Sequence, residues 1–170
     1  MDIYVIDIRV AKFLPEELLK EFDYKKYNNY DKNVIHCLSY LMVNRILREI
    51  YHIGDCEIVF HLNKPILKSG RKHFSISHSG GYIAIGFSDY NCGIDIEEIK
   101  ERNYRAISEK MGFKSDSLEE FYKNWTEYEA MYKFNESNEN ISKYYSELGS
   151  YILTAVCANT DEKFELYKSF

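Results

Sequence analysis

The chain has 170 residues, 45% of them hydrophobic and 29% charged, and its net charge is −5. This size and composition allow a buried core in one domain or in two small domains packed together. The acidic balance excludes the overall basic field by which many proteins attract nucleic acid.

Residues 1–6 lack the basic and apolar regions of a signal peptide, and no segment is apolar over the length that spans a membrane. The four cysteines form no C-x-x-C pair, so neither a zinc site nor a disulfide framework is predicted. They are Cys37, Cys56, Cys92 and Cys157. We therefore expect a cytoplasmic protein, not associated with membranes, with four reduced and packed thiols.

The first half of the chain alternates strand and helix patterns. β-Branched and aromatic residues predict a strand over 2–10, and Pro15 followed by two acidic residues predicts a short helix. Apolar residues at helical spacing predict a longer helix from Asp31 to about Tyr51, ended by Gly54. A strand is then expected over 57–62.

Turn residues separate the strands of the middle of the chain. Asn63-Lys64-Pro65 predicts a turn out of the preceding strand. Three further runs then predict strands, and they are His73 to Ser77, Tyr82 to Ser88 and Cys92 to Glu98.

Helices open the last part of the chain. They are expected over about Tyr104 to Met111 and Leu118 to Phe134, the second capped by Ser115 or Asp116. After a polar loop, two runs predict a closing strand pair, and they are Gly149 to Ala158 and Glu162 to Tyr167. The repeated order of strand, helices and strands predicts an α+β fold with a pseudo-repeat that hinges near Asn91.

The run from Gly93 to Glu97 carries the first chemical signal. On a strand Asp95 and Glu97 share one side, while Ile94 and Ile96 turn into the core. Two carboxylates on one side repel each other unless a cation lies between them or one is protonated. Hard oxygen ligands suit Mg²⁺. A solvated acidic edge strand fits the same pattern.

A helical segment carries the second signal. Trp125, Glu129 and Lys133 are spaced i, i+4, i+8 and share one helix face. The carboxylate could act as a base or metal ligand beside a phosphate-binding lysine. An ordinary surface Glu–Lys pair beside a core tryptophan is the alternative.

A third segment, 74–81, combines hydroxyls, an imidazole and a Gly-Gly turn, which together can bind phosphate oxygens. A Ser–His hydrolase would need the G-x-S-x-G nucleophile elbow, and no glycine precedes Ser77 at the required position. A hydrogen-bonded turn between strands is the alternative.

In chain order these segments resemble the Sfp-like (surfactin-synthetase-activating) 4′-phosphopantetheinyl transferases. That family typically shows the elements G-K-P, F-N/S-x-S-H-S-G, G-(I/V)-D-x-E and W-(S/T)-x-K-E-(A/S)-x-x-K. The matching segments here are Asn63-Lys64-Pro65, Phe74-Ser75-Ile76-Ser77-His78-Ser79-Gly80, Gly93-Ile94-Asp95-Ile96-Glu97 and Trp125-Thr126 with Glu129-Ala130 and Lys133.

The resemblance implies two pseudo-symmetric α/β halves, 1–91 and 92–170, in a monomer. The active site would lie in the cleft between them, and the second half would carry the metal-binding carboxylates. The protein would be a holo-[acyl-carrier-protein] synthase. It would transfer the 4′-phosphopantetheine group of coenzyme A to a serine of an acyl or peptidyl carrier protein and release 3′,5′-ADP.

By position, the resemblance implies that Asp95, Glu97 and Glu129 bind Mg²⁺. Ser77, His78 and Lys133 would contact the coenzyme A phosphates, and Lys64 and Pro65 would lie along its nucleotide end. Asp95, Glu129 and Lys133 would be catalytic. Glu129, or a water that it orients, would take the serine proton, and Lys133 would stabilise charge on the phosphoryl oxygens.

The chain also departs from the family. Tyr128 stands where the family has a lysine, and the expected basic set for the 3′-phosphate is reduced to His36, Asn44 and Arg45. We therefore expect weaker coenzyme A binding than in fuller members, or a narrow range of carriers. The alternatives are a homologue that binds coenzyme A or a carrier without efficient transfer, a non-enzymatic interaction module, and a metal-dependent phosphohydrolase.

Overall fold

The computed structural model describes residues 1–11, 30–135 and 140–169. In chain order the elements are β1 (Asp2–Asp7), the 3-10 helix η1 (Ile8–Ala11), α2 (Tyr30–Glu49), β2 (Ile58–His61), β3 (Lys64–Leu67), β4 (His73–Ser79), β5 (Tyr82–Ser88), β6 (Cys92–Glu98), α3 (Tyr104–Met111), α4 (Leu118–Phe134), β7 (Ser142–Glu147), β8 (Tyr151–Cys157) and β9 (Glu165–Ser169).

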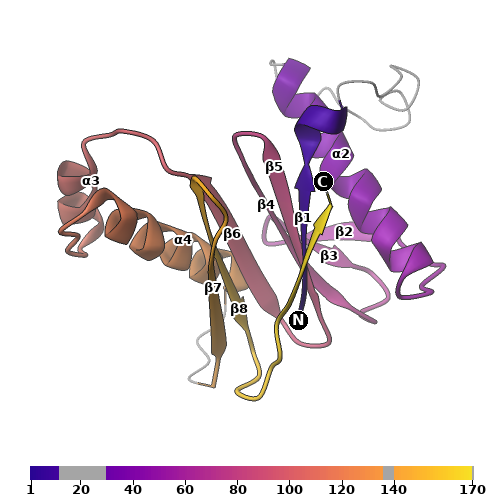
Figure 1. Cartoon of the computed structure of the whole chain (residues 1–170). Helices are drawn as coiled ribbons and strands as arrows, with labels where there is room; N and C mark the ends of the chain where they lie inside the picture. Colours follow the sequence, from indigo (N-terminus) through magenta and orange to yellow (C-terminus); the bar gives the residue numbers. More distant parts are fainter. Residues whose placement is uncertain (12–29, 136–139, 170) are drawn as a thin grey trace.

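The strands form two larger sheets and one hairpin (Figure 1). The first sheet has the order β4-β5-β1-β9, with β9 parallel to β1 and the other pairs antiparallel. The second sheet has the antiparallel order β6-β8-β7, and β2 pairs with β3 alone. The mixture of helices and largely antiparallel sheets confirms the predicted α+β class.

Apolar side chains arrange these elements in layers. Alternate residues of β1 point to opposite faces of the first sheet, so Ile3 and Val5 join one core while Tyr4 and Ile6 join another. The Ile3 side packs against β6 and β8, and the opposite side packs against α2. Helix α4 covers the other face of the second sheet through residues such as Phe134.

Several predicted elements have the observed bounds, including the strands at 82–88 and 92–98 and both helices of the last part. The predicted first strand is too long, because the Asp7 carboxylate accepts the Arg9 N–H at 2.9 Å and the chain turns into η1. Helix α2 ends at Glu49, before the predicted Tyr51. The predicted helix at Pro15 lies outside the described residues.

The turn predicted at Asn63-Lys64-Pro65 is wrong in its last two residues. Lys64 and Pro65 belong to β3, and the turn consists of Leu62 and Asn63. Both turn residues have positive φ, 47° and 66°, as a tight two-residue hairpin requires. Leu62 is an unusual residue for that conformation, so the sequence gives little sign of the hairpin.

Two predictions about the last part of the chain are also wrong. The cap of α4 is Ser117, whose hydroxyl accepts the Glu120 N–H at 3.1 Å, rather than Ser115 or Asp116. The two closing strands do not pair with each other. Strand β8 lies between β6 and β7, and β9 pairs with β1.

The connection between β5 and β6, near the predicted hinge at Asn91, leads from the first sheet to the second. Strand β9 then returns to the first sheet beside β1. In the described part of the chain, no helix is long and apolar enough to cross a membrane.

Helix α4 packs tightly against β6 at Gly93. A Cβ atom at this position would lie 2.0 Å from the Ala130 carbonyl oxygen and 2.8 Å from the Phe134 nitrogen. Backbone atoms within a helix cannot yield to such a contact, so only glycine allows α4 to lie on the sheet at this distance.

We predict that Gly93→Ala lowers the free energy of unfolding by about 3 kcal/mol or more, because overpacking against backbone must move the helix. Gly54→Ala is the control, since a Cβ there meets nothing within 4 Å. Denaturant unfolding followed by circular dichroism measures both variants. Equal midpoints for Gly93→Ala and the unmodified protein would contradict the packing described.

The cysteines are free and buried, which confirms the predicted packing of all four thiols. Burial raises the pKa of the Cys92 thiol to about 12, and it also raises the pKa of Cys37 and Cys157. Because the thiolate is the reactive form, a raised pKa lowers the reactive fraction near neutral pH.

We therefore predict slow reaction of the native protein with a chromogenic disulfide reagent at pH 8, and release of four equivalents after unfolding. The absorbance of the thiol that the reagent releases measures both the rate in the native protein and the number of thiols after unfolding. A native thiol that reacts as fast as a small free thiol contradicts the buried placement.

Candidate functional site

Strands β4 and β6 are edges of two different sheets, and three serine hydroxyls connect them. Ser75 Oγ accepts the Ile94 N–H at 3.1 Å, and Ser77 Oγ donates to Asp95 Oδ1 at 2.6 Å. Ser79 Oγ accepts the Glu98 N–H at 3.1 Å and donates to Glu97 Oε2 at 2.7 Å. These alternate residues of β4, here called the serine ladder, replace backbone pairing between the two edges.

Helix α4 reaches the same place from the other side of β6. Lys133 Nζ donates to Asp95 Oδ1 at 2.6 Å and to the Ile94 carbonyl at 3.1 Å. Asp95 is buried, with 4% of its surface exposed. Its second oxygen, Oδ2, is buried without a hydrogen-bond partner in the structure. A buried carboxylate oxygen in this state retains capacity to bind a cation.

Three carboxylates influence one another here. Burial raises the pKa of Glu97, the hydrogen bond from Ser79 opposes this, and the Asp95 charge adds to it. Burial also raises the pKa of Glu129, with a further increase from Asp95, opposition from Lys133, and a smaller increase from Glu97. Glu97 and Glu129 thus both lie in the negative field of Asp95, which a cation would relieve.

The three carboxylates predicted from the sequence as Mg²⁺ ligands all lie in this region. Within residues 1–11, 30–135 and 140–169, no group of three or more His, Cys, Asp or Glu side chains is arranged to hold a metal ion. The orphaned Asp95 oxygen and the hard carboxylate set still fit Mg²⁺. In the structure, the Lys133 ammonium balances the Asp95 charge.

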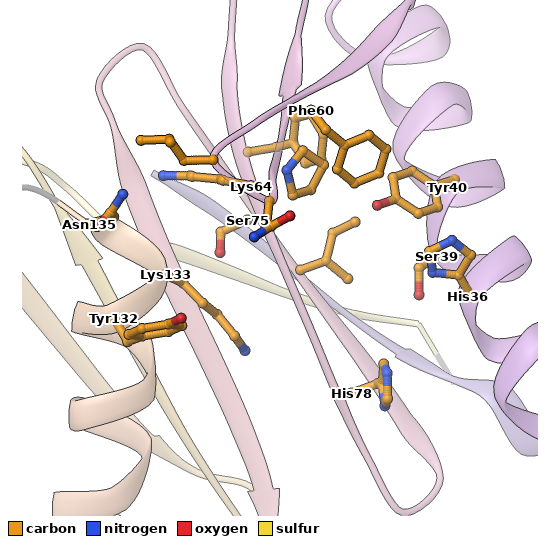
Figure 2. A pocket seen from close by; sticks show the side chains of 15 residues that line it. His36, Ser39, Tyr40, Phe60, Lys64, Ser75, His78, Tyr132, Lys133 and Asn135 are labelled. Carbon is orange, nitrogen blue, oxygen red and sulfur yellow. The ribbon is translucent and has the colours of Figure 1, made fainter. Parts of the chain in front are cut away.

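A pocket of about 350 Å³ adjoins this cluster. Figure 2 shows Tyr132 and Lys133 of α4 on one side and His36, Ser39 and Tyr40 of α2 on the other. The remaining lining residues come from the β2–β3 hairpin, from β4 and from the end of α4, and they are Phe60, Leu62, Asn63, Lys64, Pro65, Phe74, Ser75, Ile76, His78 and Asn135.

The structure divides the predicted site residues into two groups. Those that line the pocket are Lys64, Pro65, His78 and Lys133. Those outside its lining are Ser77, Asp95, Glu97 and Glu129. Lys133 connects the groups, because it both lines the pocket and pairs with Asp95.

The contacts of two side chains in this region were not predicted from the sequence. Ser79 contacts Glu97, and Asn91 joins β3 to α4 by accepting from Lys64 Nζ at 2.5 Å and donating to the Phe134 carbonyl at 2.7 Å. The alternation of serines at 75, 77 and 79 could have indicated a shared strand face. No local pattern indicates the contacts of Asn91.

The structure also shows where the residues lie that depart from the family pattern. Tyr128 is 45% exposed, and its ring lies 6.4 Å from that of Trp125. Of the reduced basic set, His36 lines the pocket, whereas Arg45 is exposed and pairs with Glu49.

Comparison with known proteins gives two relatives that are named for the same activity. The chain is 30% identical over 102 residues to the 4′-phosphopantetheinyl transferase psf-1 of Bacillus pumilus, covering 58% of this chain and 43% of the relative. It is 32% identical over 101 residues to the 4′-phosphopantetheinyl transferase gsp of Aneurinibacillus migulanus, covering 56% and 42%.

No protein-family model matches the chain. The alignments span less than half the length of each of these relatives. Over more than half of its own length the chain is similar to these two 4′-phosphopantetheinyl transferases, which confirms the resemblance predicted from the sequence.

Proposed function

We propose that the protein transfers the 4′-phosphopantetheine group of coenzyme A to a serine of an acyl or peptidyl carrier protein, with Mg²⁺ and with release of 3′,5′-ADP. The observation that carries the proposal is the position of Lys133. Lys133 lines the pocket and its ammonium pairs with the buried Asp95, so the pocket and the carboxylate cluster would form one site.

Coenzyme A would occupy the pocket. The residues that line it include His78, Lys64 and Lys133, which can carry positive charge, and Tyr40 and Phe60 add aromatic surface. Cationic donors suit the phosphates, and aromatic surface suits a nucleotide base. The ligand thus meets local positive groups although the whole chain is acidic.

Asp95, Glu97 and Glu129 would hold the Mg²⁺ ion, which when bound neutralises charge on the pyrophosphate. Asp95 would keep the hydrogen bond from Ser77 and offer its orphaned Oδ2. Lys133 balances Asp95 in the structure; with a cation present it would be available to phosphoryl oxygens at the pocket.

Glu129 would accept the proton of the carrier serine as that oxygen attacks the β-phosphate. Burial and the charges of Asp95 and Glu97 raise the pKa of Glu129, whereas Lys133 and a bound cation would lower it, so a water that Glu129 orients could take the proton in its place. The serine–phosphorus bond forms as the bond to the 3′,5′-ADP oxygen breaks, so no covalent enzyme intermediate is needed. A cytoplasmic monomer remains our expectation.

A phosphohydrolase and a pure interaction module would differ from the transferase in whether they require a carrier protein, Mg²⁺ and coenzyme A. A phosphohydrolase would degrade coenzyme A without a carrier, whereas a module would bind its partner without Mg²⁺ or coenzyme A. A homologue with little activity is the nearest alternative, because Tyr128 leaves the site one cation short of the family pattern.

We predict that apo carrier protein incubated with this protein, coenzyme A and Mg²⁺ gains the mass of one phosphopantetheine. Glu129→Gln should reduce the rate by about 10²–10⁴-fold, the range for loss of a general base. Glu119→Gln, on the exposed first turn of the same helix, should not. Intact-mass spectrometry measures all three.

The same assay separates the alternatives. No mass gain on fatty-acid, polyketide and peptide carriers, with folded protein, contradicts the proposal. Breakdown of coenzyme A without a carrier would instead indicate the phosphohydrolase. If transfer is slow, Tyr128→Lys should raise its rate.

We further predict that Lys133→Met lowers the free energy of unfolding in EDTA by about 3 kcal/mol or more, because it leaves the buried Asp95 charge without a partner. Mg²⁺ should restore more stability to this variant than it adds to the unmodified protein.

Lys123→Met is the matched control. This lysine is on the same helix and pairs with Glu119 and Glu147 at the surface, so its loss should change stability little. Thermal unfolding with EDTA or Mg²⁺ gives both comparisons. Equal small losses for the two lysine variants would show that Asp95 does not depend on Lys133.

A further inference from the structure

The three rungs of the serine ladder make different contacts. In the hydrogen bonds described above, Ser75 contacts only the backbone of β6 and Ser77 contacts only the Asp95 carboxylate. Ser79 contacts both a backbone N–H and a carboxylate. We propose that Ser79 is a positioning residue that fixes the Glu97 carboxylate for cation binding. This inference rests on the proposed function.

The chemistry of one hydroxyl explains why Ser79 can orient Glu97. A serine hydroxyl has one proton and two acceptor lone pairs. The Glu98 N–H occupies a lone pair at 3.1 Å, which fixes the oxygen, and the proton then points to Glu97 Oε2 at 2.7 Å. Ser79 thereby ties the Glu97 carboxylate to the backbone of the next residue on the same strand.

The turn after Ser79 holds the hydroxyl in place. Gly80 has φ +54°, and a Cβ there would lie 2.4 Å from both Glu98 Oε2 and Tyr151 Oη. The Tyr151 hydroxyl also accepts the Gly81 N–H at 3.2 Å. The end of β4 is therefore fixed against β6 and β8, and Ser79 has little freedom to move away from Glu97.

The neighbouring carboxylate, that of Glu98, has a different partner. Glu98 pairs with Lys100 at 2.7 Å, whereas Glu97 receives the Ser79 bond. Asp95, two residues earlier and on the same side, receives the Ser77 bond. The ladder thus orients both β6 carboxylates predicted to hold Mg²⁺, and partners of this kind commonly change metal affinity by about 10- to 100-fold.

The test is a titration of the whole protein with Mn²⁺, followed by electron paramagnetic resonance in the absence of coenzyme A and carrier. Ser79→Ala should weaken Mn²⁺ binding by about 10- to 100-fold. Ser79→Thr keeps the hydroxyl and should bind close to the unmodified protein.

Ser75→Ala is the matched control. It removes a hydroxyl from the same strand and a bond of the same 3.1 Å length to a β6 N–H, but no bond to a carboxylate. It should lose thermal stability as Ser79→Ala does while keeping its Mn²⁺ affinity. A purely structural role for Ser79 would give both alanine variants the same Mn²⁺ affinity.

A double-mutant cycle shows whether Ser79 acts through Glu97. In a Glu97→Gln background, Ser79→Ala should weaken Mn²⁺ binding no further. Equal affinities of the unmodified protein and Ser79→Ala overturn this inference alone, and transfer to the carrier would still stand. Absence of Mn²⁺ binding by the unmodified protein overturns it together with the metal part of the proposed function. If Ser79→Ala does not fold, Ser79→Cys, a weak donor of similar shape, provides the same comparison.

Discussion

The contact between the edges of β4 and β6 supports both the fold and the site. These strands belong to different sheets, and serine hydroxyls rather than backbone pairing bridge them. The bridge satisfies edge N–H groups of β6 that would otherwise be buried without partners. It also leaves space along β6 for carboxylates, because a paired backbone strand would bring main-chain groups of its own to that edge. Glycine at position 93 allows α4 to close over the opposite side.

That arrangement concentrates negative charge around one buried carboxylate. Asp95 is buried, and the fields of Glu97 and Glu129 add to its own. Lys133 compensates part of the charge from α4 while also facing the pocket. This cluster would repel the pyrophosphate of the proposed ligand, and a divalent cation between the two would reduce that repulsion.

Much of this could be predicted from local pattern, since period-two and period-3.6 signals located β5, β6, α3 and α4. The spacing of Asp95 and Glu97 correctly put them on one side of a strand. Pairings over long separations could not be predicted: β9 lies parallel to β1 across almost the whole chain, and nothing local encodes that partnership. The sequence predicted a phosphate contact for Lys133, but its pairing with Asp95 depends on how α4 lies across β6. The hairpin at Leu62 was missed because its turn residues break the usual preference.

The most direct measurement is anomalous diffraction from crystals grown with Mn²⁺ and coenzyme A. We predict a manganese peak coordinated by Asp95, with the coenzyme A pyrophosphate beside it and Lys133 turned from Asp95 toward the phosphates. Coenzyme A bound outside the pocket between α2 and α4, or manganese absent from Asp95 while coenzyme A is bound, would contradict it.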